Sequence, residues 1–325
     1  MDEHETAYRT PFRSWDTRGW VRSKPHQPTE FADGRAFFTP EVVPLLALPA
    51  AAALSRDAVD DLCARHLQWH LAMTVDLELG PVNDAVHVVR DSGDVFPRDL
   101  RTDALRLYTD EAGHAEMCAT MADAVERATG VAPPAGPPPF VRAVRDAAAA
   151  AEPGARDAVR LLAAFVSETL ISATLTRVPF DERVHVGVRQ LVADHAEDER
   201  RHAVLFRDVF ARYWPSLDAA VRRAVGLLLP DLITTFLAPD DAELAVAAAA
   251  HADVLGDPVV AAGEAALRAT ANGAFLAAAE PTLRVLHEHG AFDDPDVAAA
   301  FVDSGLFPDI GSAALRRPSE ALAPR

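Results

Sequence analysis

Two short segments, Asp110-Glu111-Ala112-Gly113-His114 and Asp198-Glu199-Arg200-Arg201-His202, repeat the pattern Asp-Glu-x-x-His and decide how the chain folds. Within each segment Glu and His are three residues apart, so on a helix both side chains project from one face and can reach the same metal ion. His195 precedes Glu199 by four residues and adds a third potential ligand to that face. A single Glu-x-x-His is more often an ordinary solvated helix face, but two copies on separate helices weaken that interpretation.

Two further carboxylates stand alone in apolar surroundings. Glu168 interrupts the largely apolar run from Leu161 to Ser172, and Glu78 lies in the segment Ala-Met-Thr-Val-Asp-Leu-Glu-Leu-Gly-Pro over residues 72–81. Burying an ionised carboxylate without a partner is costly, so each of these residues needs a cation nearby. Asp76 competes with Glu78 for this role, but two residues along a helix place it on nearly the opposite face.

Helical spacing dominates the rest of the sequence, and strand signals are scarce. Ser55 is a plausible N-cap, Gly80-Pro81 predicts a kink, and Gly130 with the proline-rich loop 131–139 predicts a helix end. The helices expected to carry the ligands cover residues 55–91, 98–129, 161–175 and 188–213. Ala-rich helices are expected beyond Pro215, with breaks near Pro239, Gly256 to Pro258, Gly290 and Pro308.

The lengths of these helices bring the carboxylates to one level of a bundle. Glu78 and Glu111 each lie about 11 or 12 residues from the connection between their helices, or roughly 17 Å along the axis. Glu168 comes level with Glu199 if the last helix begins near Val188, beside Gly187. The resulting ligand set is Glu78, Glu111, His114, Glu168, His195, Glu199 and His202.

This set indicates a pair of divalent cations. Four carboxylates offset the charge of two such ions, and mixed carboxylate and imidazole ligation suits iron, or alternatively manganese. A Glu from each of two helices plus a Glu-x-x-His from each of two others is the pattern of ferritin-like di-iron proteins. His195 is an additional ligand to that pattern. Asp110 and Asp198 are candidate acceptors for the ring N–H groups of the ligand histidines.

The predicted fold is therefore all-α, a ferritin-like four-helix bundle with additional packed helices. Residues 1–40 are expected to form an N-terminal arm and residues 41–325 a single helical di-iron domain. Within that domain the ligand helices fall in 55–214 and the extra helices in 215–325.

The order Glu, Glu-x-x-His, Glu, His-x-x-x-Glu-x-x-His resembles the p-aminobenzoate N-oxygenase family of di-iron enzymes, over roughly Trp15 to Tyr213. The resemblance implies that the seven residues are iron ligands, with no catalytic residue beyond them. It also implies an O2-dependent monooxygenase that converts an amine, aromatic or biosynthetic, to hydroxylamine, nitroso or nitro products through a peroxo-diferric intermediate. An external electron donor, a ferredoxin or a reductase, and a homodimer are further expectations. No local signature identifies the substrate-binding groups.

The composition limits the cellular compartment and the partners that we expect for this protein. With 325 residues, 50% of them hydrophobic, the chain can bury a sizeable core. The net charge of −18 disfavours nucleic acid and anionic membranes. Only Cys63 and Cys118 are present, which favours a reducing compartment. The N-terminal residues lack the apolar core of a signal peptide, and no apolar run reaches the roughly 18 residues of a membrane span. We expect a cytoplasmic protein.

Several alternatives remain open on the sequence alone. The same metal core could oxidise carbon, as a hydroxylase or desaturase, or serve a ferritin-like iron-binding or ferroxidase protein, and a purely structural helical protein is a third possibility. Tyr108 could hold a radical, although a packing role is favoured. His66 and His70 share one helix face with a spacing of four, but His70 lies roughly 12 Å along the axis from Glu78, so we do not expect them to bind the metal.

Overall fold

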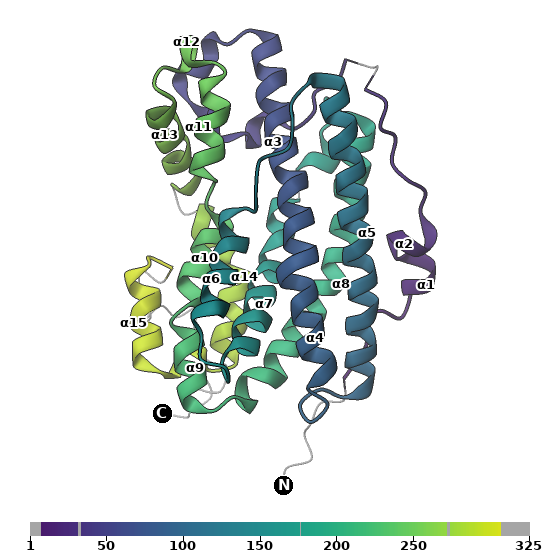
Figure 1. Cartoon of the computed structure of the whole chain (residues 1–325), viewed down its shortest axis with the longest axis vertical. Coiled ribbons are helices and arrows are strands. Elements are labelled where there is room, and N and C mark those ends of the chain that lie inside the picture. The colour runs from purple at the N-terminus through teal and green to yellow at the C-terminus, as the bar shows by residue number, and fades with distance from the viewer. Residues whose placement is uncertain (1–7, 32–33, 176, 272–273, 307–325) are drawn as a thin grey trace, which may run out of the picture.

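The computed structural model describes residues 8–31, 34–175, 177–271 and 274–306, and these residues are almost entirely helical (Figure 1). The only β pairing within these ranges is an isolated bridge between Ala36 and Val184. The all-α prediction is thus confirmed. The break expected near Pro308 lies outside the described residues.

Four long helical segments form the centre of the fold. They are α3 (Arg56–Leu77), which continues through a π-helical turn at Glu78–Val82 into α4 (Asn83–Asp91), then α5 (Arg98–Thr129), α7 (Arg156–Thr174) and α8 (Val186–Ser216). Among them, α3 packs on α5, α4 on α5 and α7, and α8 on α5 and α7. Figure 1 shows α4, α5, α7 and α8 running lengthwise through the molecule.

The start of α3 and the end of α5 are set by the residues that the sequence indicates. The Ser55 hydroxyl accepts a hydrogen bond from the amide of Ala58 at 3.2 Å, as an N-cap does. Gly130 takes the left-handed conformation with φ +76° directly after α5, where a residue with a Cβ atom would be strained. The proline-rich loop then carries the chain to α6 (Pro139–Ala150).

Helix α8 begins at Val186, two residues before the expected start near Val188. The reason is His185, whose Nδ1 atom accepts a hydrogen bond from the amide of Gly187 at 3.2 Å and so caps the helix. Gly187 has a packing role as well, because a Cβ atom there would meet the carbonyl oxygen of Pro28. The far end of α8 runs through Pro215 to Ser216, beyond the expected end near Tyr213.

Helix α7 is apolar almost all round because other helices cover it on several sides. Besides α4 and α8 it contacts α6, α9 (Ala219–Gly226), α10 (Leu229–Leu237) and α14 (Ala274–Glu288). The hydroxyl groups of Thr169 on α7 and Thr282 on α14 are 2.6 Å apart, which pairs two polar atoms inside this apolar contact.

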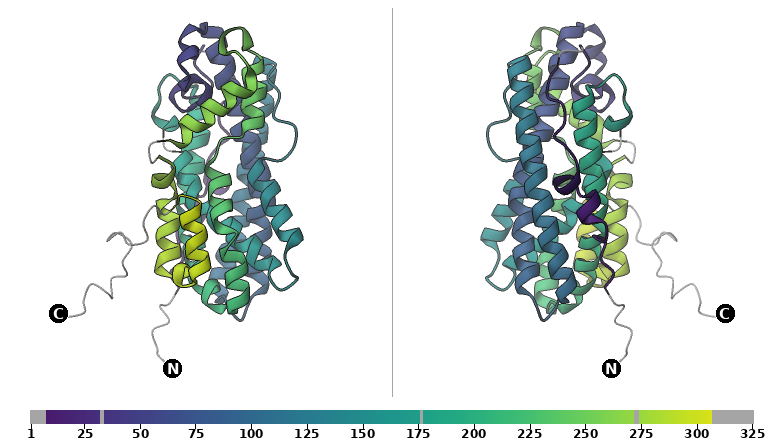
Figure 2. Two further views of the ribbon diagram at one scale, coloured as in Figure 1. Left: turned by 90° about the vertical axis from the view of Figure 1, so that its left-hand side faces the viewer. Right: turned by 90° about the vertical axis from the view of Figure 1, so that its right-hand side faces the viewer.

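The remaining elements lie at the two ends of the bundle. Helix α11 (Asp241–Ala249) packs on α13 (Pro258–Thr270) at one end, with α12 (Ala252–Leu255) between them in the chain, and α15 (Pro295–Asp303) lies near the other end (Figures 1 and 2). Five short 3₁₀ helices complete the fold of the described residues: η1 (Pro40–Val42), η2 (Pro44–Ala47), η3 (Pro49–Ala53), η5 (Val178–Phe180) and η6 (Ala291–Asp293).

The N-terminal part of the described chain lies along the outside of the bundle. It contains two single helical turns, α1 (Trp15–Arg18) and α2 (Trp20–Ser23), and α2 contacts both α5 and α8 (Figure 2, right). Phe12 and Trp20 of this segment are buried. The name arm is used from here on for residues 8–24 only, a part of the N-terminal arm expected over residues 1–40.

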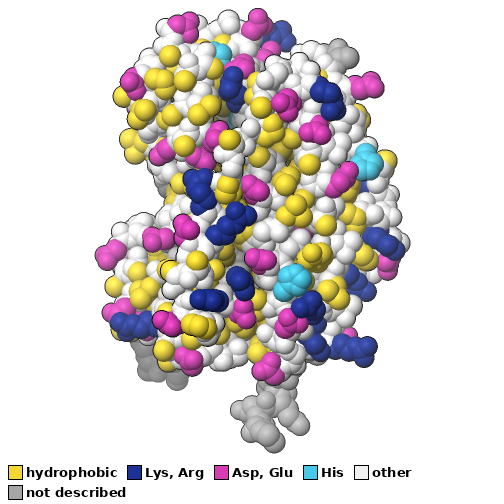
Figure 3. Space-filling view, in the orientation of Figure 1, with side chains coloured by type: hydrophobic (Ala, Val, Ile, Leu, Met, Phe, Trp, Pro, Cys, Tyr) yellow, Lys and Arg dark blue, Asp and Glu magenta, His cyan; other side chains and the backbone are white. Residues whose placement is uncertain are grey.

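Acidic and basic side chains are interspersed with apolar ones on the face shown in Figure 3. Among the described residues, no helix combines the length and the apolar character needed to cross a membrane.

Candidate metal centre

Seven carboxylate and imidazole side chains converge inside the bundle. Each has an exposed fraction of 1% or less. They come from the turn after α3, from α5, from α7 and from α8, and they are Glu78, Glu111, His114, Glu168, His195, Glu199 and His202. All seven residues singled out from the sequence therefore lie in the interior of one bundle.

One group consists of Glu78, His114, His195 and Glu199, each of which offers a ligand atom within 4.8 Å of the others. The Nε2 atom of His195 lies 2.9 Å from Oε1 of Glu78 and 3.1 Å from Oε1 of Glu199. The Nδ1 atom of His114 is 3.8 Å from the same oxygen of Glu78. Donor atoms from three helical segments thus face a common point.

A second group consists of Glu111, His114, Glu199 and His202, again with ligand atoms within 4.8 Å of one another. The Nδ1 atom of His202 lies 2.9 Å from Oε1 of Glu111 and 3.1 Å from Oε1 of Glu199. Glu168 approaches this group from α7, with Oε2 at 3.8 Å from Nδ1 of His202. Because the two groups share His114 and Glu199, they define two adjacent positions for a cation.

Although several of these donor atoms contact one another, others in the two groups lack a hydrogen-bond partner. Both carboxylate oxygens of Glu78 and one oxygen each of Glu111, Glu168 and Glu199 have no hydrogen-bond partner among the described residues. Both ring nitrogens of His195 also lack a hydrogen-bond partner among the described residues, although Nε2 lies close to two carboxylates. Buried polar atoms without partners are costly, and a bound cation would satisfy them. The residues therefore fit a metal site.

The electrostatics of the carboxylates agree with this fit. Burial, reinforced by the neighbouring carboxylates of Glu199 and Glu111, raises the pKa of Glu168 well above its ordinary value. Burial also raises the pKa of Glu78 to about 7, although the nearby His195 opposes the rise. Several acids crowded into a space without water favour any positive charge that can enter it.

The same excess of negative charge raises the pKa of two of the histidines. Burial disfavours the protonated form of His114, but hydrogen bonds to Asp198 and Glu111 overcome this and raise its pKa well above the ordinary value. For His202 burial is likewise outweighed, chiefly by the charges of Glu111 and Glu199, and the pKa of the imidazole rises. Metal cations and protons compete for such nitrogens, so a metal ion would be held most tightly here where the proton is lost.

The ring nitrogens on the far side of two histidines contact aspartates. The Nε2 atom of His114 lies 3.2 Å from Oδ2 of Asp198, and Nε2 of His202 lies 3.3 Å from Oδ2 of Asp110. Each aspartate thus contacts the histidine of the other Asp-Glu-x-x-His segment, an exchange that the sequence does not reveal. Such contacts fix the ring orientation and leave Nδ1 free to face a metal.

The arm covers both of these contacts. The indole Nε1 of Trp15 donates to Oδ1 of Asp110 at 2.7 Å, and the backbone amide of Trp20 donates to Oδ2 of Asp198 at 3.2 Å. The ring of Phe12 stacks on His202 with centroids 6.0 Å apart. No pattern in the sequence indicates these partners.

Glu78 owes its position to a local widening of its helix. It is the first residue of the π-helical turn Glu78–Val82, which contains Pro81. Proline has no amide hydrogen and its ring clashes with the preceding turn, so in a helix interior it kinks or breaks the regular hydrogen-bond pattern. The kink expected at Gly80-Pro81 therefore takes the form of a wide turn, a feature that is frequent at functional sites.

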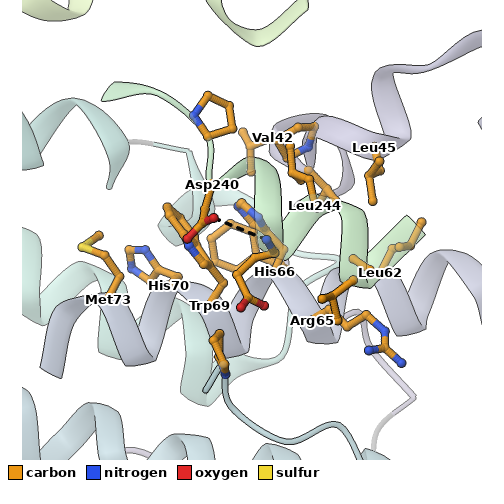
Figure 4. A pocket seen from close by; sticks show the side chains of 18 of the residues that line it. Val42, Leu45, Leu62, Arg65, His66, Trp69, His70, Met73, Asp240 and Leu244 are labelled. Carbon is orange, nitrogen blue, oxygen red and sulfur yellow. Dashed lines mark hydrogen bonds between the residues drawn. The ribbon is translucent and has the colours of Figure 1, made fainter. Parts of the chain in front are cut away.

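A cavity of about 500 Å³ lies beside the half of α3 that leads to Glu78 (Figure 4). Its wall includes Phe38, Trp69 and Phe236, and the histidines His66 and His70 also line it. Further lining residues are Val42, Leu45, Leu62, Arg65, Met73, Asp240, Glu243 and Leu244. Residues from η1, η2, α3, α10 and α11 meet here, which is why no local sequence pattern indicates the cavity.

The cavity adjoins the metal centre through α3. Met73 is five residues before Glu78, about 7.5 Å along the axis. Burial lowers the pKa of His70 to about 3, and the charge of His195 lowers it further, so the two imidazoles are near enough to interact. The Nε2 atom of His70 is buried without a hydrogen-bond partner among the described residues. His70 thus lines the cavity and also interacts with His195 of the candidate metal centre.

Three residues weighed on the sequence, His66, His70 and Tyr108, lie outside the candidate ligand groups. Tyr108 is 39% exposed on α5 and packs edge-on against His87 with ring centroids 5.8 Å apart.

The fold and the site together define a helical-bundle protein with a buried carboxylate–histidine cluster that could hold metal ions. The family model of p-aminobenzoate N-oxygenase AurF matches residues 2–276. The chain therefore belongs to this family of N-oxygenase enzymes, as its ligand order indicates. A comparison with curated proteins finds no match.

Proposed function

We propose that this protein is an O2-dependent di-iron N-oxygenase that converts an amine to hydroxylamine and onward to nitroso or nitro products. The observation that carries the proposal is the convergence of six buried donor side chains in two overlapping groups, with buried Glu168 beside the second group. Membership of the p-aminobenzoate N-oxygenase family supports the reaction class. The donor chemistry suits iron, with manganese as the second choice.

In this proposal Glu78, His195 and Glu199 hold one ion, and Glu111, Glu168 and His202 hold the other. His114 lies between the two groups. Bound iron would supply the activation of dioxygen, a chemistry that belongs to the metal and not to the protein. In the first oxidation one oxygen atom joins the amine nitrogen and the other leaves as water, with two electrons and two protons from an external donor.

The cavity is the proposed binding site for the amine. Its aromatic wall of Phe38, Trp69 and Phe236 suits a flat aromatic ring. Burial lowers the pKa of His66 to about 4, so this imidazole is neutral at pH 7 and presents no charge to an apolar ligand. The unpaired Nε2 of His70 is positioned to hydrogen-bond an amino group near the metal centre.

The arm and the buried bundle exclude water from the reacting atoms. Phe12, stacked on His202, is 2% exposed, and Trp20 is 4% exposed. A dry site strengthens the attraction between the carboxylates and the cations. It also protects reactive species from side reactions with solvent.

Iron reconstitution followed by product analysis tests the proposal. Metal-free protein is loaded with Fe²⁺ and reacted with a panel of aromatic amines, ¹⁸O2 and a reductant. We expect about two iron ions per chain and ¹⁸O-labelled hydroxylamine, nitroso or nitro compounds by mass spectrometry. Oxygen on carbon would instead indicate a hydroxylase, and uptake of iron far beyond two ions without organic product would indicate an iron-storage protein.

A further inference from the structure

A continuous chain of contacts joins the arm to the metal centre. The Trp15 indole donates to Oδ1 of Asp110 at 2.7 Å, and Oδ2 of the same carboxylate lies 3.3 Å from Nε2 of His202. The opposite ring atom of His202, Nδ1, faces the carboxylates of Glu111 and Glu199. One aromatic ring of the arm is thus connected through two side chains to the proposed ligands.

The indole lies at the boundary between interior and solvent. Trp15 is half-buried, whereas Asp110 and His202 are fully buried. The guanidinium groups of Arg22 and Arg106 lie 5.2 and 5.9 Å from the centre of the indole ring. The contacts therefore run from the surface of the molecule to the interior of the bundle.

The arm is held firmly in this position. Tyr8 donates to Oδ2 of Asp103 on α5 at 2.6 Å. Lys24 donates to Asp194 and to Glu197 of α8, both at 2.7 Å. Because the arm is anchored on both sides of Trp15, the indole has a fixed position relative to Asp110.

The second aspartate–histidine contact is built differently. Asp198, which faces His114, accepts hydrogen bonds from the backbone amide of Trp20 and from the guanidinium of Arg201. The indole Nε1 of Trp20 has no hydrogen-bond partner among the described residues. Either contact would suffice to hold a histidine in place, but of the two only the contact through Asp110 ends at a ring atom of an aromatic side chain.

We propose that Trp15 is the point at which electrons enter the protein, and that Asp110 and His202 carry them to the iron pair. An external one-electron carrier is oxidised by one electron, and one ferric ion is reduced to the ferrous state. Two such transfers reduce both ions. The inference rests on the proposed di-iron function.

This route is separate from that of the amine. Trp15 lies in α1 beside α5, whereas the cavity opens next to α3 and α11 on the other side of the bundle (Figure 1). The carrier and the amine can therefore be bound at the same time without competing for one surface.

Light-driven reduction measures the route directly. Cys63 and Cys118 are both fully buried, so a ruthenium bipyridyl complex can be attached selectively to an introduced cysteine in Arg18→Cys. A laser flash then reduces the oxidised iron pair, and its absorbance reports the rate. Iron content, the optical spectrum and the midpoint potential of the iron pair are measured on the same samples.

Trp15→Phe is compared with Tyr8→Phe in this labelled background. Both variants remove one hydrogen bond from the arm to a buried carboxylate of α5, but Tyr8 contacts Asp103, which is not connected to His202. We expect Trp15→Phe to slow reduction about tenfold or more, equivalent to about 1.4 kcal/mol in the activation free energy, at unchanged iron content and midpoint potential. Tyr8→Phe should leave the rate within about twofold.

Three results would overturn the electron route. They are an unchanged rate in Trp15→Phe, an equal slowing in Tyr8→Phe, and a slowing that accompanies lost iron or a shifted potential, since the last two indicate a structural role. If the parent protein itself binds no iron pair, the proposed function fails, which is distinguishable because the iron count is made first.

Discussion

The Nε2 atom of His202 lies 3.3 Å from Oδ2 of Asp110, a residue 92 positions earlier in the chain and on another helix. Asp198 has the matching contact with His114 at 3.2 Å. Each Asp-Glu-x-x-His segment thus supplies the carboxylate that orients the histidine of the other. The two halves of the proposed metal centre are consequently coupled, and damage to one helix should affect ligands on both.

Replacement of Asp110 tests this coupling. In Asp110→Asn the amide can still accept a hydrogen bond, but the negative charge that makes the His202 imidazole a stronger ligand is lost. We expect the affinity for Fe²⁺ to fall about 10- to 100-fold, measured by competition with a chelator. Asp103→Asn is the control, because Asp103 is equally buried on α5 but contacts Tyr8 and Arg106. Equal affinities in the two variants would contradict the role of Asp110.

Glu168→Gln should have opposite effects on the metal-free and iron-loaded protein. Burial and neighbouring carboxylates raise the pKa of Glu168, so without metal this side chain is costly in either protonation state. Gln removes that cost, and we expect the metal-free variant to gain about 1 kcal/mol in the free energy of unfolding while iron is bound less tightly. Calorimetry with and without iron measures both. Glu116→Gln, an exposed change on α5, should alter neither.

Trp69→Ala tests the binding of the amine. Trp69 lines the cavity and stacks on His66 with centroids 5.6 Å apart. Loss of the ring should raise KM for an aromatic amine about tenfold, the equivalent of 1 to 1.5 kcal/mol of aromatic contact, with iron content unchanged. An aliphatic amine of similar size provides the control. If both amines lose the same affinity, the cavity does not select aromatic rings.

His66 should make the metal-free protein less stable as the pH is lowered below 6.5. Burial lowers the pKa of His66 from 6.5 to about 4. Above pH 6.5 His66 is unprotonated in both the folded and the unfolded protein. Between pH 6.5 and 4 His66 binds a proton in the unfolded chain but not in the folded protein, which favours unfolding. His66→Gln should make this loss smaller by about 1 to 2 kcal/mol in urea titrations. His26→Gln, at an exposed histidine, should leave the pH dependence as it is.

Local signals were enough to predict much of the bundle. Ser55 and Gly130 mark helix ends because capping and left-handed φ depend only on neighbouring residues. The seven donor residues could be selected because their spacing is helical and an isolated acid in an apolar run needs a partner. The metal they bind remains a prediction.

Other features depend on contacts between distant segments, and no local pattern encodes them. The exchange of aspartate partners between helices, the indole on Asp110 and the cavity between α3 and α11 all belong to this class. The earlier start of α8 has a related cause, because His185 as a cap is less easily recognised than Ser or Asp.

The order of synthesis gives the arm a particular place in the assembly of the protein. Trp20 is made well before Asp198, which lies 178 positions further along the chain and accepts a hydrogen bond from the Trp20 amide. The arm must therefore wait until the last ligand-bearing helix has been made before it can dock. Until then the two histidines stay uncovered on the arm side, so the nascent chain passes through a stage in which iron could be loaded before the outer wall is completed.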